Sequence, residues 1–129
     1  MLDARTAIFD VLRQSADDAD FDLEEHLLPL IERIGWPAVR DSVFAALESE
    51  EKPLWTPAAA ALWGAVLDKR ELDANLAIAL VYFRLSPSPA EEDNLAWSIA
   101  SRLKGVGYLS SYDPHADPQV QTHIERLRR

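Results

Sequence analysis

Hydrophobic positions recur along this chain at the spacing of an α-helix. In residues 3–15, Ile8, Val11 and Leu12 occupy positions i, i+3 and i+4, so they share one face. Comparable helical segments cover residues 22–34, 37–49, 56–67, 71–86, 89–104 and 118–127. The alternation of period two that marks a half-buried strand is absent over any useful length. The pattern therefore predicts an all-α fold of about seven helices.

Capping residues and prolines indicate where these helices begin and end. Asp22 and Glu25 have the spacing of a capping box, although Asp replaces the usual Ser or Thr. A capping residue precedes a proline at Thr56, Ser88 and Asp117. Pro29 lies inside the second predicted helix, where we expect a kink or a shortened first half. The small residues 58–61 are expected to allow close approach of a neighbouring helix.

The stretch from Leu76 to Leu85 is apolar nearly all round, and Arg84 is its only charged residue. A helix of this kind must be covered on several sides. We expect it at the centre of the fold, with helices 56–67 and 89–104 and one more packed around it. Arg84 is then expected near one end, as a local counter-ion for acidic residues.

Helix spacing indicates how the helices are paired. Predicted helices start near residues 22, 57 and 89, and Trp63 and Trp97 are 34 residues apart. A helical-hairpin repeat has this kind of period. Residues 1–129 are therefore predicted to form a single domain of antiparallel hairpins, stacked as in HEAT repeats. A compact irregular helical bundle is the alternative.

Composition excludes several functional classes. The net charge of −9 opposes binding to a phosphate backbone, which needs a clustered positive face. There are no cysteines, so disulfides and zinc–thiolate sites are excluded. No apolar run is long enough to span a bilayer, and the N-terminus lacks the core of a signal peptide. Ten arginines against three lysines, with abundant Ala and Leu, are typical of GC-rich bacterial genomes. We expect a cytoplasmic bacterial protein with neither a nucleic-acid nor a membrane partner.

The negative charge is concentrated in the first two fifths of the chain. Residues 1–53 hold 13 acids and five bases, whereas the remainder is nearly balanced. If short connections make successive helices antiparallel, the first, third and fifth connections share one end of the stack. Lys52 is the only base expected near these connections. The fifth connection adds three acids to the same end of the stack, which are Glu91, Glu92 and Asp93. The acids of the other two connections, here called the acidic end, are Asp17, Asp18, Asp20, Asp22, Glu24, Glu25, Glu48, Glu50 and Glu51.

The acidic end has two interpretations. Acids in the first turn of a helix are favoured by the helix dipole, so some of them need no function. Others lie at a predicted helix C-terminus, where negative charge is disfavoured, or in a loop with more acids than capping requires. These six are Asp17, Asp18, Asp20, Glu48, Glu50 and Glu51. They predict that the acidic end docks the basic surface of another protein.

One other group of residues could form a metal or catalytic site. Asp113, His115 and Asp117 alternate along a loop, and carboxylate and imidazole groups could hold a divalent metal. The favoured interpretation is a hydrogen-bonded loop that leads into Asp117 as a helix N-cap. No nucleophile–base pair stands out, so we expect neither an enzyme nor a bound cofactor or metal.

A small, acidic, cysteine-free helical chain without a catalytic motif is better explained as a binding protein. In size, charge, helicity and bacterial composition, it resembles the small acidic immunity proteins of bacterial toxin–immunity pairs, including those of contact-dependent inhibition. The resemblance implies a monomer that forms a one-to-one complex with a cognate toxin, typically a basic nuclease, and occludes its active site. The alternative is a helical-repeat adaptor that holds a peptide or partner helix in a groove between hairpins. A third possibility is a metal-dependent enzyme centred on Asp113, His115 and Asp117.

Overall fold

The computed structural model describes residues 3–85, 95–105 and 113–129, and these residues form seven α-helices and two short 3₁₀ turns. The helices are α1 (Ala4–Asp17), α2 (Leu23–Ile34), α3 (Trp36–Glu48), α4 (Trp55–Leu67), α5 (Ala74–Leu85), α6 (Leu95–Leu103) and α7 (Pro118–Leu127). The 3₁₀ turns are η1 (Lys52–Leu54) and η2 (Pro114–Ala116). No strand occurs in the described ranges, so the predicted all-α class is confirmed.

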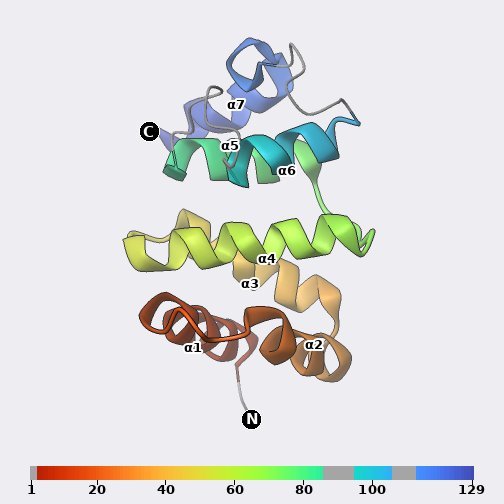
Figure 1. Cartoon of the computed structure of the whole chain (residues 1–129). Helices are drawn as coiled ribbons and strands as arrows, with labels where there is room; N and C mark the ends of the chain where they lie inside the picture. Colours follow the sequence, from red (N-terminus) through yellow and green to blue (C-terminus); the bar gives the residue numbers. More distant parts are fainter. Residues whose placement is uncertain (1–2, 86–94, 106–112) are drawn as a thin grey trace.

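The helices are stacked in layers (Figure 1). α1 and α2 form the first layer, α3 and α4 the second, and α5 and α6 the third, with α7 beyond them. The odd-numbered helices make one row, because α1 contacts α3, α3 contacts α5, and α5 contacts α7. α2, α4 and α6 make the second row. Sequential neighbours joined by short connections produce this arrangement, which is the predicted stack of helical hairpins.

α5 lies at the centre of the stack, as its sequence predicts. Six consecutive residues, Ala77 to Tyr82, are buried. α3, α4, α6 and α7 all contact this helix, so every side of it is covered. An all-round apolar sequence is stable only in such an environment, because any exposed side would leave apolar surface in water.

The first helices differ from the prediction at their ends. α1 continues to Asp17, two residues beyond the predicted end at Ser15, so Asp17 belongs to the last turn of the helix and not to the loop. The predicted cap of α2 is confirmed, because the Asp22 carboxylate accepts a hydrogen bond from the Glu25 backbone N–H at 3.1 Å. Gly35 alone joins α2 to α3 with φ +89°, a backbone conformation that other residues rarely adopt.

Pro29 does not shorten the first half of α2, and this part of the prediction is wrong. The helix is continuous from Leu23 through Pro29 to Ile34. A proline at this position removes the hydrogen bond to the carbonyl of Glu25. Pro29 and Glu25 are both exposed, so water can satisfy that carbonyl and the helix persists.

Thr56 is not the N-cap of α4, and this prediction is also wrong. α4 begins at Trp55 and continues directly from η1, without a side-chain cap. The Trp55 indole N–H donates to the backbone carbonyl of Ser49 at 3.1 Å, which holds the start of the helix close to the end of α3. The predicted start of the sixth helix at Ser88 lies outside the described residues. So do residues 106–112 of the connection between the predicted helices 89–104 and 118–127, although Pro114–Ala116 of this connection form η2.

Candidate partner-binding surface

The acidic connections lie at one end of the stack, as predicted. Arg13, in the last part of α1, pairs with Glu51, which follows α3. Arg84, at the end of α5, bonds to the end of α3. The C-terminal ends of α1, α3 and α5 are therefore neighbours. Glu91, Glu92 and Asp93, which were expected at the same end, lie outside the described residues.

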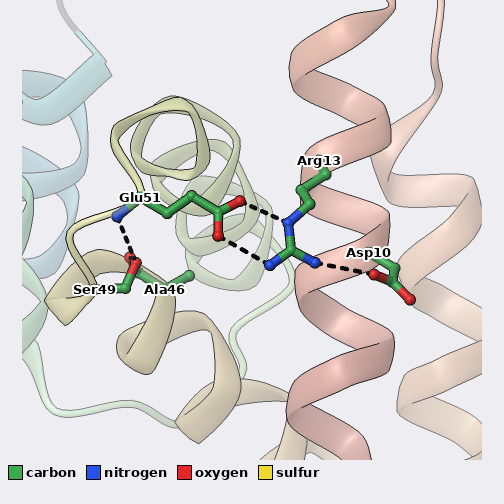
Figure 2. Close-up of polar contacts among 5 residues, drawn as sticks. All are labelled: Asp10, Arg13, Ala46, Ser49 and Glu51. Atoms are coloured by element: carbon green, nitrogen blue, oxygen red, sulfur yellow. Dashed lines mark hydrogen bonds and ion pairs between the residues drawn. The ribbon is translucent and has the colours of Figure 1, made fainter.

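Arg13 links α1 to Glu51 of the acidic end (Figure 2). Its Nε lies 2.6 Å from Glu51 Oε2 and its Nη2 lies 2.9 Å from Glu51 Oε1, so the pair is bidentate. The Arg13 Nη1 also donates to Asp10 Oδ1 at 3.0 Å. The hydrogen bonds that Arg13 donates to Glu51 lower the pKa of the Glu51 carboxyl and raise the pKa of Arg13. Glu51 is thus held within the fold by a partner that lies 38 residues away.

Replacing Glu51 by Gln is expected to make stability less sensitive to acid. Because the pKa of Glu51 is lower in the folded state, its contribution is complete above about 4.3, the usual glutamate value, and is lost as the pH falls through the folded pKa. Urea unfolding at a series of acidic pH values measures this. The decrease in stability should be shallower for Glu51→Gln than for wild type. Glu48→Gln removes a charge without an ion pair and serves as control; three equal slopes would contradict the prediction.

The Arg84 side chain is largely buried and binds backbone carbonyls in addition to an acidic side chain. Its side chain is only 11% exposed, and its Nε and Nη2 donate to the carbonyls of Leu47 at 2.6 Å and Glu48 at 2.9 Å. These carbonyls belong to the last turn of α3, so Arg84 caps that helix from outside. The guanidinium also lies 4.6 Å from the ring centroid of Trp55, while Glu50 is a looser partner at 3.8 Å. Arg84 therefore lies at the acidic end, as predicted, but mainly binds backbone carbonyls.

Most side chains of the acidic end are exposed and make no ion pair. Glu50 and Glu51 have the only ion pairs of the nine within the described ranges. Asp18 and Asp22 accept hydrogen bonds from nearby backbone N–H groups. The members without an ion pair or such a hydrogen bond in these ranges are Asp17, Asp20, Glu24, Glu25 and Glu48. The prediction that Lys52 is the only base near these connections is wrong, because Arg13 pairs with Glu51 there, in addition to Arg84, which was expected at this end.

The structure contains a second feature, an apolar groove between α2, α3 and α4. Its volume is about 280 Å³, and its walls include Leu27 and Ile31 of α2, Val39 of α3 and Trp63 of α4. Sequence reasoning missed this groove. The small residues of α4 were expected to allow close packing, and Ala58 and Ala59 are indeed buried. Ala60 and Ala61, however, line the open groove instead.

The carboxylates of the candidate metal loop have structural roles. The Asp113 side chain accepts the His115 backbone N–H at 2.9 Å and so caps η2. Asp117 accepts the Gln119 backbone N–H at 3.1 Å, which confirms the predicted N-cap of α7, and forms an ion pair with Lys104 at 3.0 Å. No group of three or more possible metal ligands occurs among the residues that the structure describes.

Tyr82 lies against the same loop. Its ring centroid is 6.1 Å from that of His115, in an edge-to-face arrangement. Burial, and secondarily the charge of Asp113, raise the pKa of the Tyr82 hydroxyl far above its usual value. The phenol therefore stays protonated at neutral pH, and Tyr82 serves as part of the core around α5.

Comparison with known proteins identifies no relative. No protein-family model, curated protein or solved structure matches this chain. Within the described ranges, no helix has the length and apolar character needed to cross a membrane. The acidic end and the groove are therefore the features from which a function can be inferred.

Proposed function

We propose that this chain is an immunity protein, which binds a cognate toxin of the basic nuclease class and occludes its active site. The observation that carries the proposal is the position of Asp17 and Glu48. Each lies in the last turn of a helix, is exposed, and makes no ion pair within the described ranges. Negative charge at a helix C-terminus is unfavourable by about 0.3–1 kcal/mol. Acids retained at such positions are explained by a partner that needs them.

Charge complementarity gives the acidic end a mechanism. The active site of a nuclease must attract phosphates, so its surroundings are basic. An acidic protein is attracted to the same surface, and such steering raises association rates by factors of about 10 to 1,000. Once bound, the immunity protein excludes the nucleic acid from the active site. A one-to-one complex is sufficient for this form of inhibition.

Growth rescue tests the proposal. The toxin is expected to be encoded directly upstream, as a large protein with a basic C-terminal domain. Expression of that domain should stop growth, and co-expression of this chain should restore it. The variant Asp17→Lys, Asp20→Lys, Glu48→Lys should restore growth poorly. Its association with the toxin domain should be slower, with a weaker dependence on salt, because the steering charges are reversed.

A matched control separates local from overall charge. Glu32, Glu71 and Glu125 are exposed acids outside the acidic end, and changing all three to Lys alters the net charge by the same amount. The control should rescue growth as well as wild type. Lys at the last turns of α1 and α3 also suits the helix dipole, so the test variant is expected to remain folded. Equal rescue by both triple variants, or an upstream gene of ordinary metabolism, would contradict the proposal.

The groove favours a second function, that of a helical-repeat adaptor. Such a protein would hold a peptide or a partner helix between its hairpins. The same triple variant distinguishes the two functions, because an adaptor whose binding energy comes from the groove would tolerate charge reversal at the acidic end.

A further inference from the structure

The groove between α2, α3 and α4 has unoccupied space and exposed apolar side chains at its edges. Leu28 of α2 is 38% exposed and Leu67 of α4 is 48% exposed, and both line the groove. They are the large hydrophobic residues of the described ranges that are classed as exposed. Gly64 also lines it, and a Cβ atom added at Gly64 would meet nothing within 4 Å. The groove is therefore open beside the backbone of α4.

The charge left unpaired at the edge of the groove is negative, because Asp68 and Arg70 pair with each other and Glu24 has no ion pair within the described ranges. Glu24 lines the groove and also belongs to the acidic end, so the two features are continuous. Asp68 and Arg70 also line it. The Arg70 guanidinium is held by Asp68 at 2.6 Å and lies 5.9 Å from the centroid of the Trp36 ring, so its charge is already paired. An apolar segment that enters this groove is therefore best accompanied by basic residues.

We propose that the groove receives the apolar face of a basic amphipathic helix of the partner protein, beside the surface that docks on the acidic end. This inference rests on the proposed function and specifies the second part of that interface. A helix in a groove is recognised through apolar side chains at positions i, i+3 or i+4, and i+7. Flanking Lys or Arg residues would then meet Glu24 and the acids next to it.

Two other occupants fit less well. A pocket for a small molecule directs a few polar groups onto its ligand, whereas two of the charged residues that line this groove, Asp68 and Arg70, bind each other. A second copy of this chain would bring together two molecules that each carry a net charge of −9. A basic partner segment relieves that repulsion and covers Leu28 and Leu67 at the same time.

The test uses a synthetic peptide of about 18 residues, long enough to form a helix when bound. It carries Leu at i, i+3, i+4 and i+7, and Lys or Arg at the other positions. One control peptide has the same composition in scrambled order, and another has Glu in place of Lys and Arg. Binding is measured by calorimetry and by the fluorescence of Trp36 and Trp63, which line the groove. We expect the basic amphipathic peptide to bind at least about tenfold more tightly than either control.

Gly64→Leu fills the groove from within and is the decisive variant. The added side chain replaces glycine in a helix and starts in open space, so the fold should be retained and the melting temperature should not fall. Affinity for the basic amphipathic peptide should fall by about tenfold or more, because the added side chain occupies the space of an apolar anchor. Ala16→Leu adds a similar side chain to an exposed position of α1 and should leave the affinity unchanged.

The outcomes separate this inference from the proposed function. Unchanged peptide affinity in Gly64→Leu, or equal binding of the scrambled peptide, overturns the groove proposal even if growth rescue succeeds. Equal binding of the Glu-substituted peptide also overturns it, because the partner segment need not then be basic. Failure of growth rescue by the wild-type chain, combined with groove-dependent binding of the basic peptide, refutes the toxin partner but leaves the groove as a peptide-binding site.

Discussion

Replacing Leu80 by Ala is expected to lower the free energy of unfolding by about 2–5 kcal/mol, the range measured for leucines in well-packed cores. Leu80 is 0% exposed and lies in the middle of α5. The substitution removes apolar contacts and leaves a cavity between helices that cannot easily collapse, because α5 is covered by four neighbours. Urea unfolding followed by far-ultraviolet circular dichroism, which reports the helix content, measures the loss.

Leu67→Ala provides the matched control for Leu80→Ala. Leu67 is the same residue type in a helix, but it lies at the exposed edge of the groove. The control should lose less than about 1 kcal/mol, because little buried apolar area is removed. Similar losses in the two variants would show that α5 does not have the central packing role assigned to it here.

Replacing Arg84 by Ala is expected to cost about 2–3 kcal/mol. The substitution removes two charge-assisted hydrogen bonds, to the carbonyls of Leu47 and Glu48, and the contact with the Trp55 ring. A hydrogen bond to a charged group contributes about 1.5–3 kcal/mol, and water can replace part of the loss at this edge of the fold. Denaturant unfolding of the purified variant measures the effect.

Two further substitutions identify which property of Arg84 matters. Arg84→Lys keeps the charge but has one nitrogen in place of the planar fork, so it should recover only part of the stability. Glu50→Gln should have almost no effect, because the Glu50 side chain is 94% exposed and lies 3.8 Å from Arg84. A large loss in Glu50→Gln, with full recovery in Arg84→Lys, would show that the ion pair dominates over the carbonyl contacts.

These interactions explain how a surface of like charges is held in place. The acids of the acidic end repel each other, and the contacts of Arg13 and Arg84 fix the chain on either side of them. Glu51 is engaged in the ion pair with Arg13, whereas Asp17 and Glu48 make no ion pair within the described ranges. The charge-reversal experiment therefore uses the free acids and leaves the Arg13–Glu51 pair intact.

The sequence by itself determined the all-α class, the central position of α5 and the caps at Asp22 and Asp117. Each of these is local, because helical periodicity shows which face of a segment is apolar, and a cap depends on residues two or three positions away. The uneven distribution of acids is also a property of the sequence alone. Antiparallel stacking then follows from short connections, so the common end of the acidic connections could be predicted.

Only the tertiary structure decided which of these acids have partners and where the surface is hollow. Arg13 and Glu51 are 38 residues apart, and Arg84 and Leu47 are 37 apart, so no local pattern links them. The groove has a similar origin. Ala60, Ala61 and Gly64 are small enough either to accept a close neighbour or to leave space, and the positions of α2 and α3 determine the result. Packing across distant segments, and not residue type, decides between a closed core and an open groove.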